Sequence, residues 1–474
     1  MKNFILFSCI CVLAQFSLAQ TGSTGIGTTA PHASSILDIN SSNKGVLLPR
    51  VSSSQRKSIV TPAAGLLVYD VDKRTIFLYD GNQWLPMMIA ASNTNTLPET
   101  IVPDNMQGDE HVGYSVAISG NYAILGANKY NEDQGTAYIY FKQNGIWTQQ
   151  AKLFASDGAI EDRFGSSVAI NGDWAVVGAY SDDVTTGTPP FIINYPDRGS
   201  IYIFQRNGTN WTQTARLTST TTNTSFYGMS IAMDGDRMVV GSTYDNGTGA
   251  AYVYQRSGNL WVLQQRIVAA DGLAGDEFGY SVDIKGNYII VGATGDDFNA
   301  IVNAGSAYVF NYNGFFWAQQ QKIAGGDDDT DLVGYSVAIN DSLALVGNST
   351  KPINGLAMHG EVKAYRRNGI IWNTIATLGV PDGIAEARIG WAIAMHGEVA
   401  IVGAIHGFGN LPGDGTSYLY KFIDGQWRFQ HKINETQGMS GVFGWSVAID
   451  GSHIIVGNPF RTLNKGGAAF VSYD

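Results

Sequence analysis

Cysteine is nearly absent from this 474-residue sequence, and its only two copies, Cys9 and Cys11, lie close to the start. Both fall within residues 1–19, which have the features of a secretory signal peptide: Lys2, an apolar run over 4–13, and small residues ahead of Gln20. We therefore expect export to the extracellular space or the outer cell surface, with the periplasm as an alternative. The mature chain would then have no disulfide bond, so burial of side chains must stabilise its fold.

Long apolar runs and an excess of basic residues are also missing. Beyond residues 1–19, no apolar run approaches the roughly 20 residues that a membrane helix needs. Lysine and arginine number 29 against 40 aspartate and glutamate residues, which gives a net charge of −11. An acidic chain is repelled by the phosphates of nucleic acids and by anionic lipids. We predict that neither nucleic acid nor a membrane is a partner.

Recognisable catalytic motifs and a helical period are absent as well. The sequence has no H-E-x-x-H motif, no phosphate-binding loop, no nucleophile elbow and no Ser/His/Asp pattern. We therefore predict that the protein is not an enzyme. Carboxylates contributed by different repeats remain an alternative, because glycoside hydrolysis needs only two of them at a suitable distance.

What the sequence does contain is one unit repeated seven times. Its clearest copy, residues 164–179, reads Phe-Gly-Ser-Ser-Val-Ala-Ile, then a turn, then Trp-Ala-Val-Val-Gly-Ala. The glycine that opens each unit, here called the anchor glycine, recurs every 51 to 63 residues. The anchor glycines are Gly113, Gly165, Gly228, Gly279, Gly334, Gly390 and Gly444. A period of this size indicates a propeller, a solenoid or an array.

Each unit is predicted to form four short strands. Glycine beside asparagine or aspartate marks a tight turn between the first and second strands and between the third and fourth. The inner runs are almost continuously apolar, whereas the fourth alternates and begins with tryptophan in six copies. We predict that these tryptophans pack between repeats: Trp147, Trp211, Trp261, Trp317, Trp372 and Trp427. The pattern predicts an all-β fold, a seven-bladed β-propeller of four-stranded antiparallel blades.

The two ends of the repeat region support a closed ring. The last copy stops after its third strand, and the strand-like residues 100–102 precede the first copy. We predict that these residues supply the missing fourth strand of the last blade. Closure of this kind removes the exposed sheet edges that invite aggregation.

The run Phe-Gly-x-Ser-Val-Ala-Ile followed by Val-Val-Gly-Ala resembles the FG-GAP repeat of integrin α-subunit propellers and their bacterial relatives. The resemblance extends from residue 97 to 474 and implies a propeller fold. Integrin-type repeats carry a calcium-binding loop ahead of the second strand. In this sequence, turns such as Asn171-Gly172-Asp173 occupy that place and are too short for three spaced oxygen ligands.

A separate, small β-rich module is predicted over residues 20–90. A helical turn at 53–58 and strands at 66–69 and 75–79 are its clearest elements, and residues 91–96 form a linker to the propeller at 97–474. The module resembles a leader domain of exported proteins and segments of phage tail fibres. Its few large apolar residues predict a thin core, so we expect it to depend on the propeller or to self-associate.

Strand order assigns every loop to one of two faces of the ring. The tight turns share one face, here called the turn face. The loops between strands two and three and those between blades share the other, here called the loop face. Loops of variable length on a rigid scaffold are typical of binding sites. The loop-face segments are also acidic, with Asp109-Glu110, Glu161-Asp162, Asp276-Glu277 and Glu386 ahead of anchor glycines and Asp182-Asp183 and Asp296-Asp297 after second strands.

The candidate metal ligands are Asp327, Asp328, Asp329 and Asp331, four carboxylates within five residues. Calcium, which prefers oxygen ligands, is the candidate cofactor. The alternative is that these and the other acids bond to their own backbone and keep the chain soluble. We predict a secreted or surface protein that binds a protein or a glycan through its loop face in adhesion or recognition. A polysaccharide-active enzyme and a purely structural fibre component are the alternatives.

Overall fold

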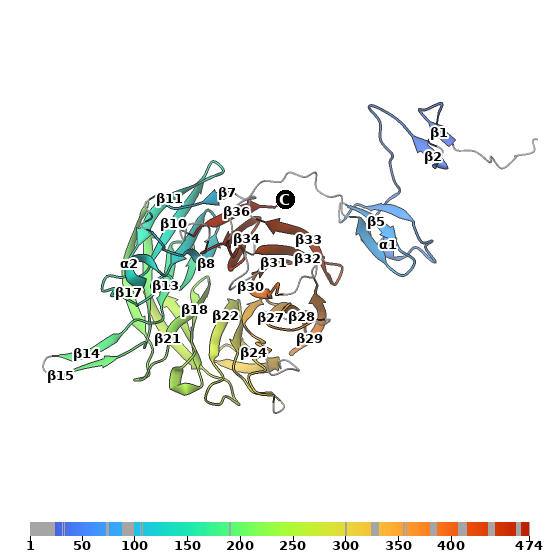
Figure 1. The fold of residues 1–474 in the computed structure, drawn as a ribbon. Helices are drawn as coiled ribbons and strands as arrows, with labels where there is room; N and C mark the ends of the chain where they lie inside the picture. The colour runs from blue at the N-terminus through green and yellow to red at the C-terminus, as the bar shows by residue number, and fades with distance from the viewer. Residues whose placement is uncertain are drawn as a thin grey trace, which may run out of the picture. The chain divides into compact units, whose positions relative to one another are not determined.

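The computed structural model describes residues 24–474 except 31, 33, 73–74, 88–98, 105, 107, 189–190, 299–300, 324–330, 354–355, 357, 380–385, 406–414, 435–440, 461–465 and 474. The predicted signal peptide and linker therefore lie outside the described residues. The chain forms two compact units, residues 1–94 and residues 95–474. Nearly all of its regular structure is β-strand (Figure 1).

The N-terminal unit contains two small sheets and one short helix. Strands β1 (Thr24–Ile26) and β2 (Leu37–Ile39) pair in parallel. A four-stranded sheet has the order β3 (Arg50–Val51), β4 (Leu67–Asp70), β5 (Thr75–Tyr79), β6 (Trp84–Met87). The helix α1 (Ser53–Lys57) begins with a capping box, in which Ser52 and Gln55 bond to each other's backbone. The predicted helical turn and the two predicted strands are thus confirmed.

An ion pair occupies the centre of the N-terminal unit. The Arg56 side chain is 2% exposed and donates from Nε to Oδ2 of the fully buried Asp70 at 2.9 Å. The guanidinium also lies 3.6 Å from the ring centroid of Phe77. Among the described residues of this unit, Val68 and Phe77 are the buried apolar side chains. The core is therefore thin, as predicted, and the pair of charges is enclosed by very little apolar material.

The described residues of the second unit contain seven four-stranded antiparallel sheets. The first four are β8 (Val112–Ser119), β9 (Tyr122–Ala127), β10 (Thr136–Gln143), β11 (Ile146–Leu153); β12 (Ser167–Asn171), β13 (Trp174–Ala179), β16 (Ser200–Asn207), β17 (Asn210–Thr218); β18 (Tyr227–Asp234), β19 (Arg237–Ser242), β20 (Ala250–Ser257), β21 (Leu260–Ile267); and β22 (Phe278–Lys285), β23 (Tyr288–Ala293), β24 (Ser306–Tyr312), β25 (Trp317–Ile323). The other three are β26 (Ser336–Ile339), β27 (Leu343–Asn348), β28 (Glu361–Asn368), β29 (Ile371–Leu378); β30 (Ile389–His396), β31 (Val399–Ala404), β32 (Thr416–Ile423), β33 (Gln426–Asn434); and β34 (Ser446–Asp450), β35 (His453–Gly457), β36 (Ala468–Ser472), β7 (Glu99–Ile101).

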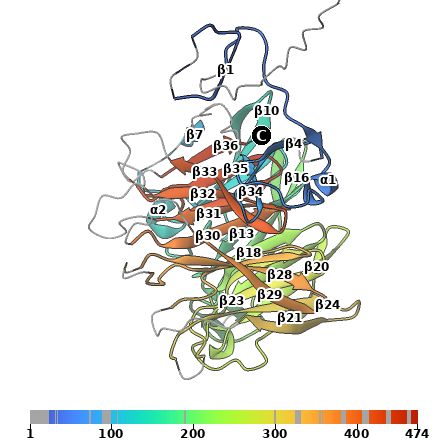
Figure 2. The ribbon, with the colours of Figure 1, turned by 90° about the vertical axis from the view of Figure 1, so that its right-hand side faces the viewer.

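These sheets are arranged around a common axis (Figure 1). The first strand of each sheet contacts the first strand of the next, and β34 of the last sheet contacts β8 of the first, so the inner strands form a closed ring. Strands of one sheet, such as β30 to β33, lie side by side in the view turned by 90° (Figure 2). The predicted closure is confirmed, because β7 pairs antiparallel with β36 and places Ile101 opposite Ala468.

Short segments outside the four-stranded sheets lie in the loops between strands two and three. They are the helical turn α2 (Tyr130–Asp133), the 3-10 turn η1 (Asp245–Gly247), and a two-stranded hairpin of β14 (Val184–Thr188) and β15 (Phe191–Tyr195). The hairpin forms its own sheet and projects away from the ring (Figure 1).

Two glycines meet where each sheet joins the next, and in six of the seven junctions a serine bonds to one of them, which explains the repeated motif. The anchor Gly165 lies against Gly126 of β9, and a Cβ atom on Gly126 would stand 2.0 Å from the Gly165 carbonyl oxygen. That same oxygen accepts a hydrogen bond of 2.8 Å from the Ser115 hydroxyl. The contact recurs around the ring and includes the closing pair, where Ser446 donates to Gly113 at 2.7 Å. Only glycine permits this approach of two backbones.

The tryptophans that begin the fourth strands pack on the preceding sheet. Trp147 stacks on Phe470 with 4.2 Å between ring centroids. The indole N–H groups of Trp211, Trp317 and Trp372 donate to glutamines on the fourth strand of the preceding sheet, namely Gln150, Gln264 and Gln320. The prediction that these residues pack between repeats is confirmed.

Candidate functional site

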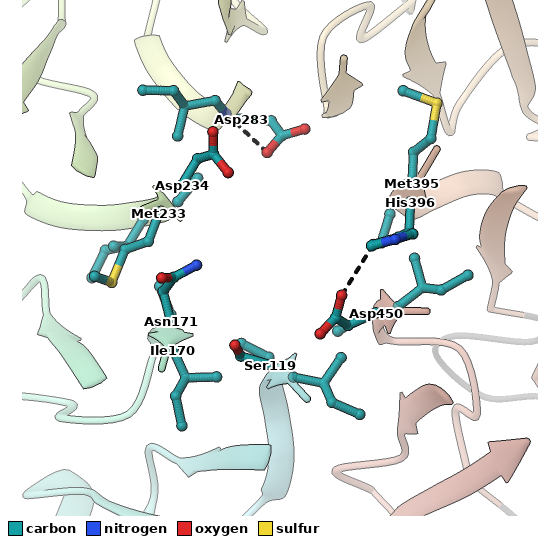
Figure 3. A pocket seen from close by; sticks show the side chains of 18 of the residues that line it. Ser119, Ile170, Asn171, Met233, Asp234, Asp283, Met395, His396 and Asp450 are labelled. Atoms are coloured by element: carbon teal, nitrogen blue, oxygen red, sulfur yellow. Dashed lines mark hydrogen bonds and ion pairs between the residues drawn. The ribbon is translucent and has the colours of Figure 1, made fainter. Parts of the chain in front are cut away.

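A cavity lies on the axis of the ring, near the turn face. Its volume is about 330 Å³, and it is lined by the last residues of the inner strands, just ahead of the tight turns. Figure 3 shows polar side chains from several sheets converging on it. Those labelled in Figure 3 are Ser119, Asn171, Asp234, Asp283, His396 and Asp450, and Lys285 also lines the cavity.

The polar side chains at the mouth of the cavity bond to the neighbouring sheet. Asp234 accepts from the Lys285 ammonium at 2.7 Å and from the Gly286 backbone N–H at 2.8 Å. Asp450 accepts from the Gly120 backbone N–H at 2.6 Å, and His396 Nδ1 lies 3.0 Å from its other oxygen. These carboxylates thus link consecutive inner strands. Their contacts hold neighbouring parts of the ring together.

Asp283 is the single exception at its position in the cavity wall. The other six repeats have alanine at this position: Ala117, Ala169, Ala232, Ala338, Ala394 and Ala448. The Asp283 carboxylate accepts from its neighbour's backbone, Ile284 N–H, at 2.9 Å and from Ile339 N–H in the next sheet at 2.7 Å. Burial nevertheless raises the pKa of Asp283 to about 7, because the loss of hydration outweighs these two hydrogen bonds. Aligning the repeats would have revealed this residue in the sequence.

Asp283 is expected to make the stability of the propeller depend on pH. Its pKa is higher in the folded chain than the ordinary value of 3.8, so between about pH 4 and pH 7 the folded state holds more protons than the unfolded state. Stability should therefore fall as the pH rises through this range, by on the order of 2 kcal/mol between pH 5 and pH 8. Urea unfolding of the wild type and of Asp283→Ala at both pH values measures the effect. The free energy of unfolding of the variant should fall less between the two pH values than that of the wild type. An equal fall in the two proteins would contradict the assignment.

At the loop-face end of the inner strands, aromatic side chains surround the axis. They follow the anchor glycine in five of the seven repeats and are here called the axial aromatic ring: Tyr280, Tyr335, Trp391, Trp445 and Tyr114. Consecutive members have ring centroids 5.2, 4.7, 4.9 and 5.5 Å apart. Burial raises the pKa of all three tyrosines, so their hydroxyls stay protonated at neutral pH and can donate hydrogen bonds.

Arginine, glutamate and histidine residues of the loops flank the axial aromatic ring. The residue two positions before the anchor glycine has a positive φ in most repeats. In four of these repeats that residue is His111, Arg163, Glu277 or Arg388. The Arg388 guanidinium lies 5.9 Å from the Trp391 ring centroid, and that of Arg163 lies 5.6 Å from the ring of Tyr180. Tyrosine, tryptophan and arginine together are the residue types enriched in protein interfaces.

Much of the predicted acidic rim is buried. In four repeats a buried carboxylate accepts from a third-strand tyrosine and pairs with a fourth-strand cation: Glu110 with Tyr138 and Lys152, Asp182 with Tyr202 and Arg216, Asp245 with Tyr252 and Arg266, and Asp296 with Tyr308 and Lys322. Asp162 and Asp276 accept from backbone N–H groups three residues earlier, at 2.5 and 2.6 Å. These acids stabilise the loops, while Asp109, Glu161, Asp183, Asp297 and Glu386 are exposed.

The candidate calcium ligands are only partly described. Asp327, Asp328 and Asp329 lie outside the described residues. Asp331 is fully buried and pairs with the Lys351 ammonium at 2.9 Å. Among the residues that the structure describes, no three His, Cys, Asp or Glu side chains are grouped closely enough to hold a metal ion. The structure therefore gives Asp331 an ion-pair partner, and calcium binding at 327–331 stays a prediction.

A ring of four-stranded antiparallel sheets joined by repeated contacts defines a β-propeller. Residues 97–140, 147–204, 211–254, 261–310 and 427–472 match the family model of the FG-GAP repeat and make up just over half of the chain. The chain belongs to the FG-GAP repeat family. Residues 25–98 match the model of the phage tail like trimerisation region.

Comparison with solved structures and curated proteins adds two findings. The chain is similar to the crystal structure of Saccharomyces cerevisiae Sqt1, with 10% identity, a TM-score of 0.43, and coverage of 79% of this chain and 98% of that chain. No curated protein matches the sequence. In the described part of the chain, no helix is long and apolar enough to cross a membrane.

Proposed function

We propose that this protein is an exported, non-enzymatic β-propeller that binds a protein ligand through its loop face. FG-GAP repeats suggest a ligand-binding propeller and are typical of extracellular or surface proteins. The observation that carries the proposal is the axial aromatic ring, flanked by Arg163 and Arg388, at the centre of the face that bears the variable loops. Aromatic and arginine side chains at the centre of a surface supply most of the binding energy in protein interfaces.

We further propose that the N-terminal unit holds three copies of the chain together. The match of residues 25–98 to a trimerisation region supports this. So does the surface of the unit, because Ile36, Leu47 and Val60 are 84%, 76% and 84% exposed while very few apolar residues are buried. Association of copies of the unit would bury these side chains, which the single copy leaves in water. Trimerisation would give three loop faces per assembly and raise the avidity for a surface ligand.

The proposed function is tested by binding of the labelled protein to intact target cells. Binding that is lost after protease treatment of the cells indicates a protein ligand, and loss after periodate oxidation indicates a glycan, the alternative ligand. The Trp391→Ala and Trp445→Ala variants should each weaken binding at least tenfold, because each removes a side chain of the axial aromatic ring.

The matched control is Phe315→Ala. Phe315 is an aromatic residue that is 89% exposed, but it lies in the turn between β24 and β25 on the turn face. This variant should bind like the wild type. Equal binding by all variants, or loss only with Phe315→Ala, would place the ligand away from the axial aromatic ring.

A further inference from the structure

The β14–β15 hairpin has an apolar face whose outer residues, Phe191 and Ile193, are exposed. Cross-strand pairing puts the side chains of Val184, Thr186, Phe191, Ile193 and Tyr195 on one side, here called the hairpin face. Phe191 is 81% exposed and Ile193 is 53% exposed. The opposite side carries Thr185, Gly187, Ile192 and Asn194. Large apolar and β-branched side chains are thus concentrated on one side of a ribbon that contributes only Val184, at its base, to the buried residues.

Contacts at the base of the hairpin fix it to the propeller. Val184 is 5% exposed, and Asp183 accepts from the Asp197 backbone N–H at 3.0 Å and from the Asn194 amide at 3.3 Å. The Arg198 guanidinium lies 5.1 Å from the Tyr195 ring centroid. These contacts set the direction in which the hairpin leaves the ring. Beyond them a two-stranded ribbon alone is marginally stable in water, and both of its edges are open to pairing.

Charge indicates what covers the hairpin face. Residues 184–195 contain no charged side chain, although the whole chain carries a net charge of −11. Copies of an acidic chain repel one another over most of their surfaces, so an uncharged, apolar face is where two copies can approach at the least electrostatic cost. The hairpin face is far smaller than the roughly 1,000 Å² that a stable interface needs. It can hold copies together only if another part of the chain already keeps them close.

We propose that the hairpin face packs against the hairpin face of another copy of this chain within the trimer held by the N-terminal unit. The inference rests on the proposed trimer, because that assembly supplies the high local concentration that a small contact requires. The hairpins would then fix the spacing of the propellers, and their open edges would be covered. A free strand edge without lysine or another charge is otherwise an aggregation hazard.

A cysteine cross-linking experiment tests the hairpin contact on the purified protein. Cys9 and Cys11 lie in the predicted signal peptide, so Ile193→Cys and Ile192→Cys each give a mature chain with a single thiol. These two neighbours are 53% and 57% exposed but lie on opposite faces of the hairpin. A short bismaleimide should convert Ile193→Cys to covalent dimers at least fivefold more efficiently than Ile192→Cys. Light scattering before the reaction reports the oligomeric state.

Hydrogen exchange provides a second readout that does not depend on thiol geometry. Amides of residues 184–195 should be protected in the wild type and in Ile192→Asp, and should exchange at least tenfold faster in Ile193→Asp, where like charges meet across the contact. Suppose that the protein is a trimer, but the two cysteine variants cross-link equally and the two aspartate variants exchange at equal rates. This result would overturn the hairpin contact but not the proposed trimer. A monomeric protein would overturn both.

Discussion

Gly165→Ala is expected to destabilise the propeller by more than about 4 kcal/mol, the range reached only by severe disruption of packing. Gly165 has a φ of +92°, and a Cβ atom on it would lie 2.3 Å from the Thr136 carbonyl oxygen and 2.8 Å from the Ala127 backbone nitrogen. Both neighbours are backbone atoms of the preceding sheet and cannot rotate away. The two sheets would have to separate. Urea denaturation followed by tryptophan fluorescence measures the loss.

A glycine seven residues away separates this steric effect from backbone strain. Gly172 also has a positive φ, of +58°, but a Cβ atom there would meet nothing within 4 Å. Gly172→Ala should therefore cost only the strain of a left-handed residue, about 1–2 kcal/mol. If Gly165→Ala and Gly172→Ala lowered the free energy of unfolding by the same amount, close approach of the backbones would not explain why glycine is required at position 165.

Asp70→Ala is expected to unfold the N-terminal unit while the propeller stays folded. The substitution leaves the Arg56 guanidinium, which is 2% exposed, without its carboxylate partner, and breaking a buried ion pair costs about 3–5 kcal/mol. It also removes the acceptor of the Ser53 hydroxyl, which bonds to both Asp70 oxygens at 3.0 and 2.9 Å. A unit with two buried apolar residues among those described has little other stabilisation to lose.

Hydrogen exchange distinguishes local from global unfolding in this variant. Amides of β4 and β5 should lose protection, while those of the propeller sheets should exchange as in the wild type. Asp72→Ala is the control, because Asp72 is an exposed carboxylate in the same unit that accepts one bond of 2.8 Å from the Ser53 backbone. It should leave β4 and β5 protected. Loss of protection in the control as well would mean that any change near α1 unfolds the unit.

The repeat made most of the fold predictable, because seven copies of one pattern identify each strand even where a single copy departs from it. The strands, the tight turns, the packing of tryptophans such as Trp147 and the closing strand around Thr100 all follow from spacing and apolar pattern. The Ser–Gly–Gly contact was visible as a motif, but its cause was not. Only the distance from Gly165 to the backbone of the preceding sheet shows why no side chain is tolerated.

The candidate site was less predictable, because local sequence does not reveal burial. Glu110 and Asp182 read as surface acids among loop residues, yet each is buried against a tyrosine and a cation from strands of its own repeat. The axial aromatic ring is the converse case: Trp391 and Trp445 are 54 residues apart in the sequence and become neighbours because the first strands of consecutive sheets pack together. For the hairpin the sequence indicated only a long loop, since its apolar face depends on the register in which β14 pairs with β15.

The closing strand also determines how tension would pass through the molecule. Residues 88–98 join the N-terminal unit to β7, and β7 is held in the last sheet by three paired residues, Glu99 to Ile101, before the chain enters the first sheet. A ligand bound at the loop face and pulled away from an N-terminal tether would load the β7–β36 pairing before any other strand. Its rupture would open one sheet edge and lengthen the tether, while the six sheets built from continuous repeats stayed intact. The pairing that closes the ring would thus be the first part of the propeller to break under load.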